Sequence, residues 1–112
     1  PSHGGRVVDI VMNDEALHEQ WVGEVYAMRD RIKSMRTKLK SVLEEKIPDR
    51  SFDYLTAQNG MFSFTGLTPE QVAQLQSKYG IYMVSNSRMC VAGLNSTNID
   101  YVANAMVDVL KD

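Results

Sequence analysis

The sequence predicts an α+β fold in which helices pack on a short β-sheet and one long N-terminal helix connects to them. A long amphipathic stretch covers residues 14–46, and short apolar segments bounded by glycine or turn residues follow it. Further helical patterns cover residues 68–79 and 97–110. Helices that alternate with a few short strands are typical of a small two-layer α+β domain. We expect residues 1–46 to hold a short helix and the long helix, and residues 47–112 to form the α+β core.

The long helix is predicted by its apolar periodicity and by the absence of proline before Pro48. Asn13 is a good N-cap, and acidic residues follow it in the first turn. The apolar residues recur at steps of three or four, at Leu17, Trp21, Val25, Met28, Ile32, Met35, Leu39 and Val42.

This helix is longer than the domain that it would serve. Its span of about 33 residues is roughly 50 Å long, whereas a compact domain of about 100 residues has a diameter of roughly 35 Å. The helix therefore bends, self-associates, or lies against protein outside this chain. We interpret the chain as a fragment of a larger protein.

The other elements follow from shorter patterns. Thr68, Pro69 and Gln71 combine an N-cap, a proline at the first helical position and a capping-box glutamine, so a helix begins there and ends before Gly80. For the rest of the chain we expect a short helix over 6–12, a turn over 48–51, strands over 52–55, 60–66, 81–84 and 87–93, and a last helix over 97–110.

Composition limits the class of protein. The chain has 112 residues, 44% of them hydrophobic, which is enough for one modest core. The formal charge is 12 − 14 = −2, so no basic field favours nucleic acid or an anionic membrane. One cysteine excludes an internal disulfide, and no apolar run approaches the roughly 20 residues that span a bilayer. We expect no nucleic-acid partner, no membrane association and a cytoplasmic location.

An arginine within a short apolar strand is the strongest candidate for a binding residue. Period-two alternation puts Arg88, Cys90 and Ala92 on one face and Met89 and Val91 on the other. A guanidinium beside small neighbours can hold a carboxylate with two parallel hydrogen bonds. From spacing alone, the alternative is an edge-strand arginine in solvent or paired to a structural aspartate.

Two stretches indicate a family. NGMFSFTGL (residues 59–67) and SRMCVAGLN (residues 87–95) are long and unusual. With the rest of the chain they closely resemble the C-terminal part of the aspartate and aromatic-amino-acid aminotransferases. These are class I, fold type I enzymes that depend on pyridoxal 5'-phosphate (PLP). The second stretch is more similar to the aromatic, or tyrosine, branch. In this family a long helix connects the large domain to the small domain, in agreement with the geometric argument.

The resemblance implies a reaction and a role for two residues. The whole enzyme would transfer the amino group of an aromatic amino acid or aspartate to a 2-oxo acid such as 2-oxoglutarate, as a homodimer. Arg88 would bind the substrate α-carboxylate, and Phe62 would line the substrate pocket. The family's PLP lysine and phosphate-binding residues lie upstream of this segment. We therefore expect no catalytic and no cofactor-binding residue here, and no activity of the chain alone.

One residue departs from the family pattern, and three others do not form the metal or nucleophile sites that their residue types suggest. Ser87 stands where many relatives have glycine, which raises a question about the turn but not about the arginine. His3 and His18 lack the spacing of metal ligands, so no metal site is expected, and Cys90 is interpreted as a small buried residue.

A basic stretch on the long helix supports the alternative function. Six cations are interpreted mainly as a solvated helix face, namely Arg29, Arg31, Lys33, Arg36, Lys38 and Lys40. The alternative to an enzyme part is a stand-alone helical protein-interaction module that uses this long amphipathic helix, and its motivation is the apolar stripe from Leu17 to Met28, which nothing in the chain is expected to cover.

Overall fold

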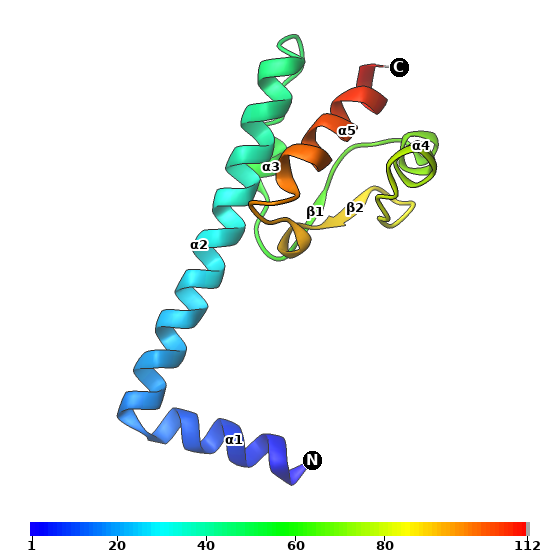
Figure 1. The fold of residues 1–112 in the computed structure, drawn as a ribbon. Helices are drawn as coiled ribbons and strands as arrows, with labels where there is room; N and C mark the ends of the chain where they lie inside the picture. Colours follow the sequence, from blue (N-terminus) through cyan, green and yellow to red (C-terminus); the bar gives the residue numbers. More distant parts are fainter. Residues whose placement is uncertain (112) are drawn as a thin grey trace. The chain divides into compact units, whose positions relative to one another are not determined.

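A computed structural model describes residues 1–111 and confirms the α+β class. Contacts group the chain into two compact units, Pro1–Arg31 and Ile32–Asp112. The boundary that we expect between residues 46 and 47, which separates the long helix from the α+β core, remains a prediction. The elements are the helices α1 (Ser2–Asn13), α2 (Glu15–Lys46), α3 (Tyr54–Ala57), α4 (Pro69–Tyr79) and α5 (Ile99–Lys111), the strands β1 (Phe62–Phe64) and β2 (Arg88–Cys90), and the 3-10 turn η1 (Val91–Gly93) (Figure 1).

The predicted long helix is present and ends at the predicted residue. Its cap is Asp14 and not Asn13, because the Asp14 carboxylate accepts a hydrogen bond from the Leu17 amide at 3.0 Å. Asn13 is the last residue of α1, which begins earlier than expected. In the second unit α2 buries a row of apolar residues four apart, Met35, Leu39 and Leu43.

Helix α5 packs between α2 and α4 in the second unit (Figure 1). On one side, Lys46 Nζ donates to Asn104 Oδ1 at 2.6 Å. On the other, the Tyr79 hydroxyl donates to Asp108 Oδ2 at 2.6 Å. Buried apolar residues of the second unit form the core between these helices. Its largest fully buried members are Phe52, Leu39, Leu43, Leu55, Leu75, Ile99 and Met106.

Local signals determine the ends of α4 as the sequence predicts. The Gln71 amide donates to Thr68 Oγ1 at 3.2 Å, and Gln71 Oε1 accepts from the Thr68 amide at 2.9 Å. Gly80 closes the helix with a φ of 65°, which glycine adopts without steric cost. The predicted capping box is therefore confirmed.

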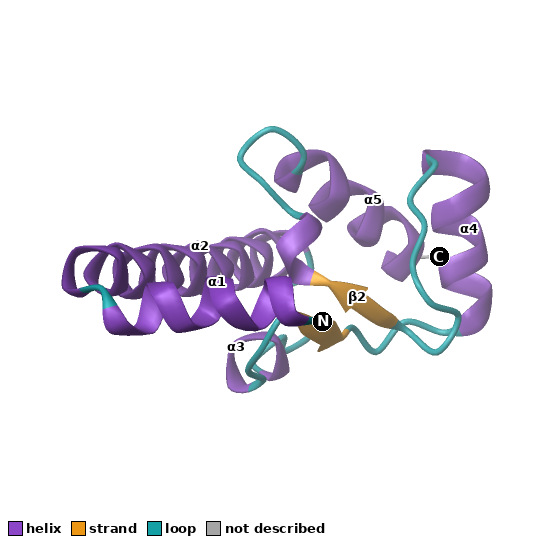
Figure 2. Ribbon diagram, turned by 90° about the horizontal axis from the view of Figure 1, so that it is seen from below, coloured by secondary structure: helices purple, strands orange, loops and turns teal. Residues whose placement is uncertain are grey.

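The sheet is small beside the helices, as Figure 2 shows. Its two antiparallel strands pair Phe62 with Cys90, Ser63 with Met89, and Phe64 with Arg88. Both strands are shorter than the predicted ranges 60–66 and 87–93. The reason is that β2 continues directly into η1. Isolated hydrogen bonds extend the pairing by one residue at each end: Thr65 N donates to Ser87 O and Val91 N donates to Met61 O, both at 2.8 Å.

The strand predicted over residues 52–55 is wrong. Phe52 and Leu55 are both buried, three residues apart, as in a helical turn. The backbone is satisfied locally, because the amides of Thr56 and Ala57 both donate to the Asp53 carbonyl at 3.1 Å. A four-residue alternation does not distinguish a strand from a helical turn when no partner strand is available.

The prediction of a strand over residues 81–84 is also wrong, because this segment is irregular. The burial does alternate, with Ile81 and Met83 half-buried and Tyr82 and Val84 exposed. Yet no strand within residues 1–111 pairs with this segment, and the Val84 amide instead donates to the Arg88 carbonyl at 3.3 Å. Alternation indicates which side chains face the core, but a strand also requires a partner backbone.

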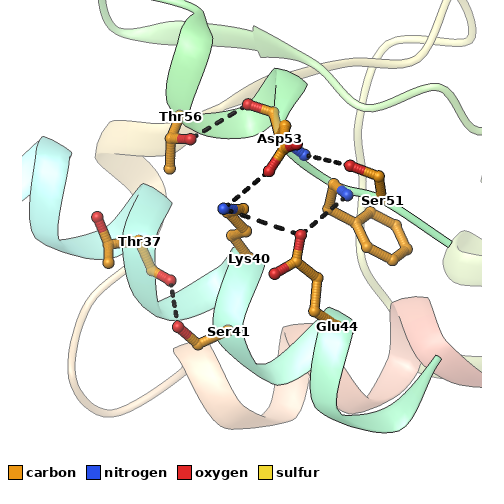
Figure 3. A network of polar contacts seen from close by, with 8 residues as sticks. Thr37, Lys40, Ser41, Glu44, Ser51, Asp53 and Thr56 are labelled. Carbon is orange, nitrogen blue, oxygen red and sulfur yellow. Dashed lines mark hydrogen bonds and ion pairs between the residues drawn. The ribbon is translucent and has the colours of Figure 1, made fainter. Parts of the chain in front are cut away.

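A polar network joins α2 to the segment before α3 (Figure 3). Lys40 Nζ lies 2.9 Å from Asp53 Oδ1 and 3.8 Å from Glu44 Oε1. The hydrogen bond between Lys40 and Asp53 raises the pKa of Lys40 and lowers the pKa of Asp53. Glu44 also accepts from the Phe52 amide at 3.2 Å, so it ties the backbone of this buried residue to α2.

The first unit, Pro1–Arg31, exposes much apolar surface. No residue of α1 is buried, and Leu17 and Trp21 on α2 are both at least 40% exposed. None of the helices within residues 1–111 has the length and apolar character that crossing a membrane requires. Exposed apolar patches of this kind mark surfaces that contact protein, membrane or ligand.

We expect the tryptophan of the 112-residue chain to report this exposure. Trp21 is 43% exposed, so its emission at nanomolar protein concentration should be red-shifted and readily quenched by acrylamide. A shift to the blue as concentration rises would indicate self-association through the same surface. Blue-shifted emission that persists at nanomolar concentration would contradict the exposure seen here.

Candidate carboxylate-binding site

The two-stranded sheet presents one outer face of four side chains. Ser63 and Met89 point to the core, whereas Phe62, Phe64, Arg88 and Cys90 are exposed. The alternation predicted for residues 88–91 is therefore confirmed. Phe62 is 53% and Phe64 is 54% exposed, so neither ring is a core aromatic.

Arg88 lies directly opposite Phe64 on this face. Thr65–Ser87 and Met61–Val91 are hydrogen-bonded positions, so alternation makes Phe64–Arg88 and Phe62–Cys90 non-hydrogen-bonded pairs. Side chains at such pairs lie closest together. Within residues 1–111 the Arg88 guanidinium has no hydrogen-bond or ion-pair partner. A structural aspartate, which the spacing alone allowed, does not neutralise it in the described chain.

The residue before Arg88 has an unusual backbone conformation. Ser87 has a φ of 71°, in the left-handed region that favours glycine, and its side chain is buried. Its hydroxyl accepts from the Gly66 amide at 3.0 Å, and its carbonyl accepts from Thr65 Oγ1 at 2.8 Å. Serine is thus tolerated because its polar atoms join the start of β2 to the end of β1.

Arg36 is the functional candidate that sequence reasoning missed. It was expected on the solvated basic face, but it is only 4% exposed. Its guanidinium donates to Leu55 O at 2.9 Å, Ser63 Oγ at 3.0 Å, Gly60 O at 2.7 Å and Phe62 O at 2.9 Å. Desolvation by burial lowers the pKa of this guanidinium. Its position beside the buried Met35 was the available signal, because α2 turns that side to the core.

Cys90 also differs from its expected burial. The thiol is exposed, because period two puts it on the same outer face as Arg88. Within the part of the chain that the structure describes, no three histidine, cysteine or carboxylate side chains gather closely enough to hold a metal ion.

The comparisons with known proteins identify the family. Residues 1–106 match Aminotransferase class I and II, and the chain belongs to this family. It is 49% identical over 110 residues to the aromatic-amino-acid aminotransferase of Escherichia coli, covering 98% of this chain and 28% of that enzyme. It is 46% identical over 112 residues to a mitochondrial aspartate aminotransferase of Dictyostelium discoideum, covering all of this chain and 26% of that enzyme.

Solved structures agree with the fold. A psychrophilic aromatic amino acids aminotransferase from Psychrobacter sp. B6, cocrystallised with aspartic acid, matches with a TM-score of 0.98 and 90% identity over all of this chain. An aromatic-amino-acid aminotransferase from Burkholderia pseudomallei, covalently bound to PLP, matches with a TM-score of 0.95 and 47% identity over 98% of this chain. In both cases this chain spans 28% of the solved chain.

Several lysines of the described residues lie in ion pairs and away from the cavity beside α4 and α5. PLP enzymes bind the cofactor through a lysine and hold its phosphate with further donors. Here Lys38, Lys40 and Lys78 pair with Asp100, Asp53 and Asp108. A cavity of about 400 Å³ beside α4 and α5 contains no lysine or arginine in its lining, which is mostly apolar.

We expect two substitutions of Ser87 to separate the effect of backbone strain on stability from the effect of the hydrogen bonds. Ser87→Ala keeps the positive φ and removes the acceptor of the Gly66 amide, so it should destabilise the chain by about 1–3 kcal/mol. Ser87→Gly loses the same acceptor but relieves the strain, so it should be more stable than the alanine variant by about 1 kcal/mol. Urea unfolding of the three proteins measures this, and equal stability of the two variants would contradict it.

Proposed function

We propose that this chain is the C-terminal small-domain part of a PLP-dependent aminotransferase and supplies the arginine that binds the substrate α-carboxylate. The whole enzyme would transfer the amino group of an aromatic amino acid or aspartate to a 2-oxo acid such as 2-oxoglutarate. Membership of the aminotransferase family supports the reaction class. The alternative of a stand-alone helical interaction module has no support from the relatives that the chain matches.

The exposed, unpartnered guanidinium of Arg88 carries the assignment. Four other cations in the described residues pair with acids: Arg29 with Asp30, Lys38 with Asp100, Lys40 with Asp53, and Lys78 with Asp108. Arg88 has none among residues 1–111, so its five donors are available to a ligand. A planar fork grips a carboxylate at two points, which fixes how the Cα–H bond of an amino acid is oriented for reaction.

The aromatic neighbours support a binding surface and not a solvated edge. Phe62 and Phe64 expose about half of each ring on the face that carries Arg88. Apolar walls exclude water and strengthen an ion pair, because the local dielectric constant falls. We infer that Phe62, diagonal to Arg88 in the register, lines the substrate pocket and contacts the substrate side chain.

Substrate preference is inferred from the relatives. The matches include enzymes described as aromatic-amino-acid and as aspartate aminotransferases. The 90% identity to the Psychrobacter aromatic enzyme favours the aromatic branch, and the aspartic acid in that crystal is consistent with a dicarboxylic substrate as well. We propose that the whole enzyme accepts both classes, binds PLP through residues outside this segment, acts as a homodimer and is cytoplasmic.

We expect Arg88→Lys in the full-length enzyme to lower kcat/KM for tyrosine and aspartate alike. Lysine keeps the charge but replaces a rigid fork by one ammonium, which should cost roughly 2–4 kcal/mol of transition-state stabilisation, or about 30- to 1,000-fold. Arg88→Ala should cost more, because the bound carboxylate would then lack any cation. Steady-state kinetics with both substrates measure the effect.

The controls separate carboxylate binding from general damage. Arg29→Lys makes the same exchange at an exposed arginine on α2 and should leave kcat/KM unchanged. An amine without a carboxylate, such as tyramine, should react equally slowly with the parent enzyme and the Arg88→Lys variant. Phe62→Leu should change the ratio between tyrosine and aspartate. Parental kcat/KM of Arg88→Lys for both amino acids would overturn the assignment.

The isolated 112-residue chain should neither retain PLP on one lysine nor transaminate. Its lysines lie outside the apolar cavity, and several are engaged in ion pairs. Incubation with PLP, reduction with borohydride and peptide mass spectrometry should find only sparse labelling spread over several lysines. Stoichiometric labelling of one lysine would contradict this expectation.

A further inference from the structure

Arg36 joins the long helix to the strand that neighbours Arg88. Its four acceptors are neutral: the carbonyls of Leu55, Gly60 and Phe62 and the hydroxyl of Ser63. They come from three successive parts of the chain, namely α3, the turn after it, and β1. One planar fork therefore fixes the path by which the chain enters β1.

The turn itself is shaped for this contact. Gly60 has a φ of 93°, a conformation that other residues rarely adopt, and its carbonyl makes the shortest of the four hydrogen bonds, at 2.7 Å. The Ser63 side chain is buried and lies on the inner face of β1. The guanidinium thus contacts both the edge and the inner face of this strand.

The outer edge of β1 is closed by side chains and not by a third strand. Because Phe62 and Phe64 are non-hydrogen-bonded positions of the β1–β2 pair, their backbone groups point away from β2. Arg36 takes the Phe62 carbonyl. Gln58 pairs with both backbone groups of Phe64: its Oε1 accepts from the Phe64 amide at 2.7 Å, and its Nε2 donates to the Phe64 carbonyl at 3.0 Å.

We propose that Arg36 is a positioning residue for substrate binding: by fixing β1 it holds Phe62, and through the Phe64–Arg88 pair it sets the orientation of the carboxylate-binding Arg88. This inference rests on the function proposed above for Arg88. β1 is the only strand that pairs with β2 within residues 1–111, so a displacement of β1 is passed to Arg88 through the ladder. A purely structural role would lower stability but would not depend on which side chain occupies position 88.

A double-mutant cycle in the full-length enzyme tests this dependence. The variants are Arg36→Lys, Arg88→Lys and the combination, and the probe is 3-phenylpropanoate, which keeps the carboxylate of phenylalanine but has no reacting amino group. Lysine at position 36 keeps the charge but offers three donors from one atom and cannot span four acceptors. Arg36→Lys should raise the inhibition constant of the probe about tenfold in the parent enzyme, and less than twofold in the Arg88→Lys background.

Two further variants keep the test decisive. Ser63→Ala removes one acceptor of Arg36 with little change in volume, so it should weaken the probe about two- to threefold, again only when Arg88 is present. It replaces Arg36→Lys in the cycle if the lysine variant does not fold. Arg29→Lys on the exposed part of α2 is the matched control and should not change the inhibition constant.

The possible outcomes separate the two proposals. If Arg88→Lys weakens the probe but the effect of Arg36→Lys is equal in both backgrounds, Arg36 is only structural and the positioning role is overturned. Absence of any effect of Arg36→Lys and Ser63→Ala also overturns it. If Arg88→Lys alone leaves the inhibition constant unchanged, the function proposed for Arg88 fails first and the role of Arg36 fails with it.

Discussion

The second unit depends on how one buried cation is satisfied. Moving the charge of Arg36 out of water is costly, and the described residues give it carbonyl and hydroxyl acceptors in place of a carboxylate. All of these acceptors lie between residues 55 and 63, so the chain after α3 must wrap closely around this side chain. An arginine suits this position because its planar fork reaches several acceptors at fixed angles.

The small sheet follows from that constraint. Three-residue strands are marginal by themselves, yet β1 is held on one edge by β2 and on the other by Arg36 and Gln58. Just before β2, Ser87 has a left-handed backbone conformation, and its hydrogen bonds with Thr65 and Gly66 stabilise that conformation. The result is a small sheet whose outer face carries Arg88, with no partner for its guanidinium among residues 1–111, and two exposed aromatic residues on the neighbouring strand.

The chain leaves more apolar surface exposed than its own packing explains. Leu17 and Trp21 on α2 and several apolar residues of α1 are exposed, and the chain spans about 28% of the relatives that it matches. Membership of the aminotransferase family gives these surfaces a context, because the matched enzymes contain much more protein than this segment. Within residues 1–111, the Arg88 guanidinium has no ion-pair partner, and these apolar side chains are not covered.

The sequence by itself determined the features that depend on neighbouring residues. The periodicity and end signals of α2 and α4, the capping box at Thr68 and the outward position of Arg88 all arise within a few residues of chain. Tertiary structure decided the rest. Residues 52–55 and 81–84 alternate like strands but have no partner backbone within residues 1–111, and Arg36 is buried although it belongs to the basic stretch. Each of these outcomes depends on groups that are distant in sequence, such as the acceptors of Arg36 about 20 to 30 residues away, and local pattern does not encode where those groups will lie.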